Sequence, residues 1–243
     1  MRRTYIDLHL CPSIDQTERV KALLEKSAEM GYSAVGIAFP VEVEEKHIDE
    51  TKKICCGLGL DLVTRADLAP KSARDLLATL KKVRRKFEVI AVYCNSREVA
   101  IQAAKDRRVD LLLFLNDPRR HFFSASEAKL ASEKSACLEI NLSQLILSEG
   151  LSRIRLMGML RRDVMVARKF GVPIVLSSGA SEPYMLRRPL DYASLAYLIG
   201  LDLEAANKAL SEAPRSIVER NRRKLSPDYI CPGVYVIKRG GDC

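Results

Sequence analysis

Histidine is scarce in this chain of 243 residues, which contains only His9, His47 and His121. A hydrolytic metal centre needs several nitrogen and carboxylate ligands held in fixed geometry. His9 lies near the end of the first apolar run, but Cys11 stands where a second histidine would complete a His-x-His pair. The scarcity of ligands argues against a catalytic metal centre, and we expect this chain to hold no metal or cofactor itself.

Long apolar runs, signal-peptide features and common cofactor motifs are also missing. No stretch of about 18 apolar residues occurs, so we expect no membrane span. Residues 1–4 lead directly into a strand-like run without an apolar leader or cleavage site, which favours a cytoplasmic protein. The sequence has no Cys-x-x-Cys, Gly-x-Gly-x-x-Gly or Gly-x-x-x-x-Gly-Lys-[Ser/Thr] motif, which argues against a zinc knuckle, a dinucleotide site and a P-loop.

Basic residues outnumber acidic ones, 40 to 31, which gives a formal net charge of +9 and a pI of about 9.2. The first 60 residues carry a net charge of −2 and the remainder +11. This asymmetry favours a nucleic-acid partner, although it also fits a protein with solvated basic faces. Aromatic residues make up only 6% and tryptophan is absent, so we expect recognition of RNA shape and backbone rather than base stacking.

Short apolar segments alternate with helical patterns along the chain. Strands are expected at residues 5–10, 34–39, 60–64, 89–93, 111–115, 137–141 and 172–176. Helices are expected at residues 17–30, 48–56, 74–87, 97–105, 127–134, 151–170, 190–200 and 202–212. Ser72 and Ser96 are expected N-caps, and Gly31, Gly57 and Gly171 are expected helix stops.

Seven βα repeats predict an α/β fold: a TIM-like βα barrel, seven-stranded or distorted, with extra C-terminal helices. An open doubly wound sheet is the alternative. No Pro/Gly-rich linker divides the sequence, so we expect one domain over residues 1–243. Residues 213–243 begin with a strongly basic stretch and are expected to form an extension packed on the barrel or trailing from it.

Polar side chains at two strand ends could converge at the barrel mouth. In regular strands, Asp7 and His9 would share one face, and so would Glu139 and Asn141. They could form a metal or acid–base site, or a buried polar network in which Asp7 or Glu139 pairs with an interior arginine such as Arg65. With so few histidines, we expect no catalytic residue and no metal here, only a vestigial polar site.

Small and basic residues indicate where an RNA could bind. The loop Ser177-Ser178-Gly179 follows the seventh expected strand and could contact a phosphate through its amides, or could be an ordinary turn. Neither serine has an obvious histidine partner, which argues against a serine nucleophile. The cations expected to contact RNA, chosen by charge and by expected loop or helix-end placement, are Arg65, Arg97, Arg107, Arg108, Arg162, Lys169, Arg187 and Arg188.

Several segments together resemble a known family. They are Asp7-Leu8-His9, Leu138-Glu139-Ile140-Asn141, Ala167-Arg168-Lys169-Phe170-Gly171-Val172-Pro173, Ser177-Ser178-Gly179-Ala180 with Leu186-Arg187-Arg188-Pro189, and Pro232-Gly233-Val234. In this order they look like the TIM-barrel subunit of archaeal ribonuclease P, protein component 3. The resemblance covers nearly the whole chain. Asp-Leu-His alone would be weak, because the related polymerase-and-histidinol-phosphatase barrels begin similarly.

The resemblance implies a ribonucleoprotein that removes the 5′ leader of precursor tRNA. It implies that the RNA subunit carries catalysis and Mg²⁺, and that this chain binds that RNA and pairs directly with another small protein subunit. The isolated chain is then expected to be inactive. One alternative is a metal-dependent phosphoesterase of the histidinol-phosphatase-like barrel type. Another is a barrel that binds only proteins.

Overall fold

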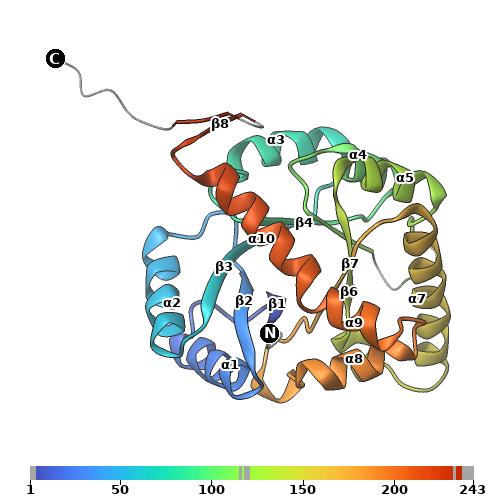
Figure 1. Ribbon diagram of the computed structural model, residues 1–243, viewed down its shortest axis with the longest axis horizontal. Helices are drawn as coiled ribbons and strands as arrows, with labels where there is room; N and C mark the ends of the chain where they lie inside the picture. The colour runs from blue at the N-terminus through green and yellow to red at the C-terminus, as the bar shows by residue number, and fades with distance from the viewer. Residues whose placement is uncertain (1–3, 115–116, 118–120, 232–233, 237–243) are drawn as a thin grey trace.

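The computed structural model describes residues 4–114, 117, 121–231 and 234–236, and its centre is a parallel sheet of seven strands that curls into a barrel (Figure 1). The strands are β1 (Tyr5–Leu10), β2 (Tyr32–Ala38), β3 (Asp61–Leu68), β4 (Val89–Tyr93), β5 (Leu111–Leu113), β6 (Cys137–Asn141) and β7 (Ile174–Ser177). Each strand pairs in parallel with the next one along the chain. This sequential order is that of a TIM-like barrel.

Helices surround the sheet and also close one end of it. They are α1 (Thr17–Glu29), α2 (Glu45–Gly57), α3 (Ala73–Val83), α4 (Arg97–Lys105), α5 (Ala125–Lys134), α6 (Ser143–Leu147), α7 (Gly150–Phe170), the 3₁₀ turn η1 (Pro183–Met185), α8 (Pro189–Tyr197), α9 (Leu203–Ala209) and α10 (Glu212–Leu225). A short antiparallel pair, β8 (Tyr229–Cys231) and β9 (Val234–Tyr235), follows α10. None of the described helices is both long enough and apolar enough to cross a membrane.

Among the described residues, backbone hydrogen bonds join β1 to the segment after β7 only at the barrel mouth. There the backbone of Cys11 donates to the carbonyl of Ala180 at 2.8 Å, and Gly179 donates to the carbonyl of His9 at 2.9 Å. At the other end, the amide of Ile6 donates instead to the carbonyl of Leu210, just after α9, at 2.9 Å. The barrel is therefore nearly closed, and the expected seven-stranded barrel is confirmed over the open sheet.

The barrel has an inner and an outer apolar core. The larger one lies between the sheet and the helices, where α1, α3, α4, α7 and α8 bury their apolar faces. The smaller one fills the barrel interior, and residues of α10 enter it beside the inward-facing strand residues. Its members are Ile6, Leu8, Ala34, Val63, Val89, Ala91, Leu111, Leu113, Cys137, Val175, Ile217 and Val218.

Helix α10 lies across the end of the barrel where the strands begin (Figure 1). Ile217 and Val218 reach into the inner core, and two arginines fasten the helix to the sheet. Arg220 bonds the buried Asp110 at 2.9 Å, and Arg222 bonds Asp61 at 2.6 and 2.9 Å. Part of the basic C-terminal stretch is thus held against the barrel by internal ion pairs.

Local sequence signals located several element ends, and three of the differences are instructive. The hydroxyl groups of Ser72 and Ser96 accept from the amides of Asp75 and Val99, so both expected N-caps are confirmed. The expected stop at Gly57 is wrong, because α2 includes Gly57 and the left-handed φ of 69° falls at Gly59.

The other two corrections concern β3 and the last helices. β3 continues four residues beyond its expected end, to Leu68. The helix expected over residues 202–212 ends at Ala209, and a further helix that was not expected, α10, begins at Glu212 with Pro214 in its first turn, where it needs no amide partner. The expected strand residue at position 115 lies outside the described part of the chain, as do residues 232–233 and 237–243 of the expected C-terminal extension.

Truncating Ile217 tests whether α10 is part of the core. The side chain is fully buried among strand residues, so Ile217→Ala should lower the free energy of unfolding by about 2–5 kcal/mol. The exposed Glu219→Ala on the same helix should change it by less than about 0.5 kcal/mol. Urea denaturation measures both. Equal effects would show that α10 does not seal the barrel.

Candidate functional site

The polar groups near the end of β1 do not share one face of the strand. The register of β1 against β2 shifts between Asp7 and Leu10, so the regular alternation of side chains breaks there. Asp7 interacts electrostatically with Tyr32 and Tyr192, which belong to the outer core, whereas His9 contacts Glu139 inside the barrel. The expectation that Asp7 and His9 lie together on one face is therefore wrong.

Arg65 occupies the centre of the barrel mouth. Its side chain is 0% exposed, and its two terminal nitrogens each donate at 2.8 Å to one oxygen of Glu139. The Nε atom donates to Asp67 Oδ1 at 2.6 Å, and Nη1 also donates to the carbonyl of Leu8 at 2.9 Å. A single guanidinium thus ties β1, β3 and β6 together through a bidentate ion pair.

His9 lies between the two carboxylates that Arg65 binds. Its Nδ1 is 2.9 Å from Glu139 Oε1, and its Nε2 is 3.0 Å from Asp67 Oδ2. Burial and the Arg65 charge both lower the pKa of His9, but the two carboxylates outweigh them and the pKa rises well above its usual value. Burial raises the pKa of Glu139, yet Arg65 and His9 together lower it to about 2. The mouth therefore holds two positive and two negative groups.

Asp7 forms a separate buried group beside this network. Its Oδ1 accepts from the amides of His9 at 3.0 Å and Ser178 at 3.1 Å. Burial raises the pKa of Asp7, although the hydrogen bonds from Ser178 and His9 oppose that shift. Asp7 thus joins β1 to the segment after β7 and takes no part in the ion pairs of Arg65.

The segment Ser177-Ser178-Gly179 has its polar groups committed to closing the barrel. Ser177 Oγ donates to Glu139 at 2.6 Å, and the amides of Ser178 and Gly179 donate to Asp7 and to the carbonyl of His9. Gly179 has a φ of 63°, and a Cβ at this position would lie 1.8 Å from the side-chain nitrogen Nδ2 of Asn141. The expected phosphate loop is therefore wrong, because its donors already have buried partners.

Asn141 also departs from its expected place in the polar site. Its Oδ1 accepts from the amide and the hydroxyl group of Ser143, at 3.0 and 2.7 Å. These bonds hold the start of α6 against the end of β6. Asn141 therefore positions a loop, and of the four expected members only His9 and Glu139 meet inside the barrel.

Sequence analysis missed Asp67, which completes the network. The expected strand stopped at residue 64, whereas β3 extends to Leu68 and places Val63, Arg65 and Asp67 on the inward side. The alternation of these residues with the apolar Ala66 and Leu68 was the available signal. The alternative interpretation of Glu139 paired to Arg65 is confirmed.

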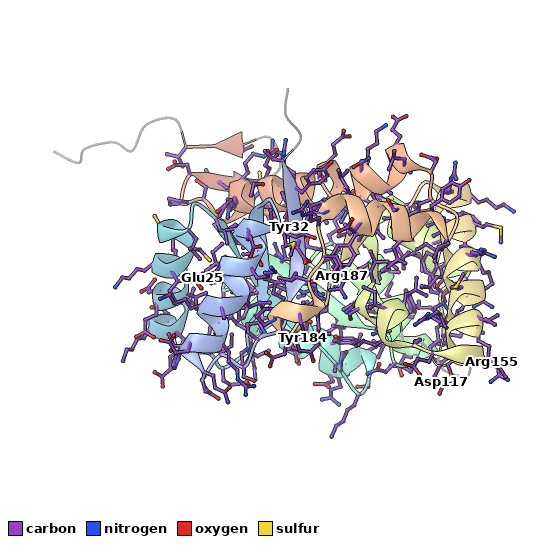
Figure 2. All side chains as sticks on the ribbon, turned by 90° about the horizontal axis from the view of Figure 1, so that it is seen from below. Glu25, Tyr32, Asp117, Arg155, Tyr184 and Arg187 are labelled. Carbon is purple, nitrogen blue, oxygen red and sulfur yellow. The ribbon has the colours of Figure 1, made fainter. Side chains whose placement is uncertain are left out.

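The cations expected to contact RNA do not form one surface. Arg65 is fully buried and cannot reach an RNA, so that expectation is wrong. Arg187 and Arg188 lie in the loop between η1 and α8, where Figure 2 labels Tyr184 and Arg187, while Arg97 is the first residue of α4 and Arg162 lies on α7. Arg107, Arg108 and Lys169 lie toward the opposite end of the barrel, because they come shortly before β5 and β7. Arg108 is half-buried and pairs with Asp106.

A cavity of about 440 Å³ opens beside the mouth between α4, α5 and α7. The exposed Arg97 begins α4, the exposed Arg162 comes from α7, and both line the cavity. His121 forms part of the lining and bonds the buried Asp163 at 2.8 Å. The first residues of α5 also line it, and helix N-termini favour anions. The cavity therefore brings together two arginines that are 65 positions apart in sequence.

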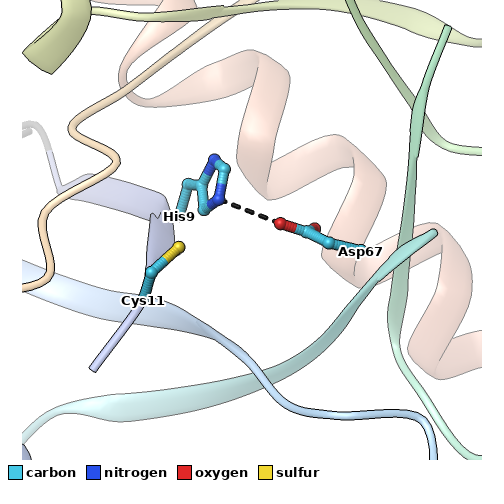
Figure 3. A group of neighbouring side chains, drawn as sticks. All are labelled: His9, Cys11 and Asp67. Carbon is cyan, nitrogen blue, oxygen red and sulfur yellow. Dashed lines mark ion pairs between the residues drawn. The ribbon is translucent and has the colours of Figure 1, made fainter. Parts of the chain in front are cut away.

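One group of side chains at the mouth could hold a cation. His9, Cys11 and Asp67 each offer a ligand atom, and these atoms lie within 4.8 Å of one another (Figure 3).

Removing the Arg65 charge tests how far the mouth depends on it. Arg65→Met should lower the free energy of unfolding by about 3–5 kcal/mol, because Glu139 and Asp67 lose a buried partner. The exposed Arg97→Met should change it by less than about 0.5 kcal/mol. Denaturant unfolding should also show that Arg65→Met with Glu139→Gln costs less than the two single changes together. Full additivity would contradict the coupling.

Comparisons with known proteins agree over almost the entire chain. The model of the RNase P subunit p30 family matches residues 4–226. Ribonuclease P protein component 3 of Methanococcoides burtonii is 26% identical over 236 residues, 97% of this chain and 95% of that protein. The same component of Methanosarcina mazei is 29% identical, covering 95% of this chain and 94% of that protein.

The fold is also found in a solved ribonucleoprotein. A chain in the cryo-EM structure of archaeal ribonuclease P with mature tRNA superposes with a TM-score of 0.82. It is 22% identical, and the match covers 98% of this chain and 100% of that chain, so it shows the same fold. The family model spans far more than half of the sequence, and this chain belongs to the RNase P subunit p30 family.

Proposed function

We propose that this chain is the barrel subunit of a ribonuclease P that removes the 5′ leader of precursor tRNA, and that it supports the catalytic RNA without cutting RNA itself. Family membership over residues 4–226 carries this proposal and favours it over a free-standing phosphoesterase. Mg²⁺ is then held by the RNA. In the assembled enzyme the chain contacts that RNA and binds one small protein subunit directly.

The interior of the mouth supports a non-catalytic role. In a hydrolytic barrel, a base or nucleophile must reach the substrate from the ends of the strands. Here His9 and Glu139 are 1% and 3% exposed, and both carboxylate oxygens of Glu139 accept from Arg65. Both groups are therefore buried and engaged with other side chains of the barrel. The polar interior therefore holds the strands together, and the proposed contact with RNA lies on the outer surface of the barrel.

The cavity lined by Arg97 and Arg162 is the proposed contact with RNA phosphates. Both arginines are exposed, and neither is tied to a carboxylate by an ion pair within the described residues. By contrast, Arg108 pairs with Asp106, and Arg222 pairs with Asp61 and Glu88. The positive charges of these two arginines are therefore partly neutralised within the protein. A planar guanidinium suits phosphate oxygens, and two of them line this cavity from different helices.

Reconstitution of the particle tests the function as a whole. Ribonuclease P RNA with the complete set of proteins should cleave precursor tRNA faster than the same mixture without this chain. The difference should be greatest at low Mg²⁺, where screening of RNA phosphates by protein cations matters most. The control is the isolated chain, which should not cleave. Equal cleavage with and without the chain at every Mg²⁺ concentration would refute the proposal.

Charge removal at the cavity tests the proposed RNA contact. Arg97→Ala and Arg162→Ala should each weaken binding of ribonuclease P RNA and reduce the slope of log affinity against log salt by about 1. The exposed Lys53→Ala on α2, elsewhere on the barrel, is the matched control and should leave the slope unchanged. Filter binding over a series of salt concentrations measures this. A slope as large in both arginine variants as in the control would place the RNA contact elsewhere.

A further inference from the structure

The rim of the barrel mouth carries a set of side chains suited to a metal ion and unused by the function proposed above. His9 ends the inner network, Cys11 follows β1, and Asp67 lies near the end of β3. One ligand atom from each lies within 4.8 Å of the other two. Figure 3 shows the sulfur of Cys11 turned toward the ring of His9, with Asp67 across from both. Two strands thus bring nitrogen, sulfur and oxygen donors to one point.

The ring of His9 is oriented as in a metal-binding histidine. Its Nδ1 lies 2.9 Å from Glu139 Oε1, and an inner carboxylate of this kind fixes the tautomer of a ligating imidazole. Its Nε2 is buried and forms an ion pair with Asp67 Oδ2 at 3.0 Å, which is the dashed line in Figure 3. Nε2 therefore points toward Asp67, and an ion bound by both atoms would replace the direct contact between them.

The other two donors are also suitably placed. Asp67 Oδ1 is bound by Arg65 Nε at 2.6 Å, which leaves Oδ2 facing His9. Cys11 is half-buried and is a free thiol. Zinc bonds of about 2.0–2.3 Å place tetrahedral ligands roughly 3.2–3.8 Å apart, so the donor atoms, now within 4.8 Å of one another, would draw closer together on binding.

We propose that His9 Nε2, Cys11 Sγ and Asp67 Oδ2 form a binding site for a divalent cation of the zinc class. A thiolate with an imidazole selects Zn²⁺ or Co²⁺ over Mg²⁺ and Ca²⁺, which prefer oxygen ligands alone. Water completes the fourth position, because Cys11 and Asp67 are partly exposed. This revises the expectation from the sequence that the chain holds no metal.

The charges around the site suit a divalent cation. Cys11 would bind as a thiolate, so its proton leaves to solvent when the ion binds. The thiolate and the Asp67 carboxylate would then lie beside the ion, and Glu139 lies behind His9 at 2.9 Å. These negative groups compensate the charge of an ion held at the barrel mouth.

Bound metal would join the end of β1 to the end of β3 at the rim. The same stretch of β1 forms the seam with the segment after β7, where few backbone hydrogen bonds close the barrel. An ion there would stabilise the seam and release protons on binding. This role is structural and independent of RNA cleavage, so the two proposals can fail separately.

Titration of the full chain with Co²⁺ as a spectroscopic probe tests the site. Wild type should bind one Co²⁺ with a sulfur-to-cobalt charge-transfer band, and Zn²⁺ should displace it and raise the Tm. Cys11→Ser should abolish the band and weaken the affinity for Co²⁺ more than about 10-fold. Loss of a residue that only hydrogen-bonds a metal ligand already lowers metal affinity by about that factor. Because Cys11 is half-buried, unchanged circular dichroism of the metal-free variant is expected and confirms folding.

The matched control replaces two exposed cysteines, as Cys56→Ser with Cys231→Ser, and should keep both the band and the affinity. The proposal is overturned if wild type shows no charge-transfer band, if Cys11→Ser retains it, or if the control loses it. The last two outcomes would identify adventitious binding to other thiols. Reconstituted cleavage of precursor tRNA, measured on the same variants, reports on the proposed function independently.

Discussion

The buried ion pair between Arg65 and Glu139 is the interaction on which the barrel mouth depends. An arginine in an apolar interior is costly unless its donors are satisfied, and here Glu139, Asp67 and the carbonyl of Leu8 accept from it. These contacts come from β1, β3 and β6, so one side chain joins three strands. They also occupy both oxygens of Glu139, which a catalytic barrel would leave open to a substrate.

The other constraint is that seven strands do not fill the circumference. In the described part of the chain, backbone hydrogen bonds link β1 to the segment after β7 only at the mouth, and Leu210 and α10 complete the opposite end. Because α10 inserts Ile217 into the inner core, its arginines lie against the sheet and bond Asp110, Asp61 and Glu88. Much of the positive charge near the C-terminus therefore serves folding, and net charge overstates the surface free to meet RNA.

Local patterns predicted the strands and several helix ends because those signals lie within a few residues. Apolar runs located all seven strands, and Ser72 and Ser96 cap as expected. The site was predicted less well, for two physical reasons. A register shift in β1 places Asp7 and His9 on different faces of the strand. The predicted end of β3 was four residues too early, so Asp67 was not recognised as a residue of the barrel interior. A break in period reverses every side-chain direction beyond it, and the sequence alone did not reveal the break.

By itself the sequence determined the barrel class, the family resemblance and the pairing of Glu139 with Arg65 as one of two interpretations. Only the tertiary structure decided which basic side chains form ion pairs within the protein and which remain exposed. Arg65 and Glu139 are 74 positions apart, and Arg222 and Asp61 are 161 apart. Such pairs form only when the sheet closes, because the free energy of an ion pair depends on burial and distance, and neither is encoded in neighbouring residues.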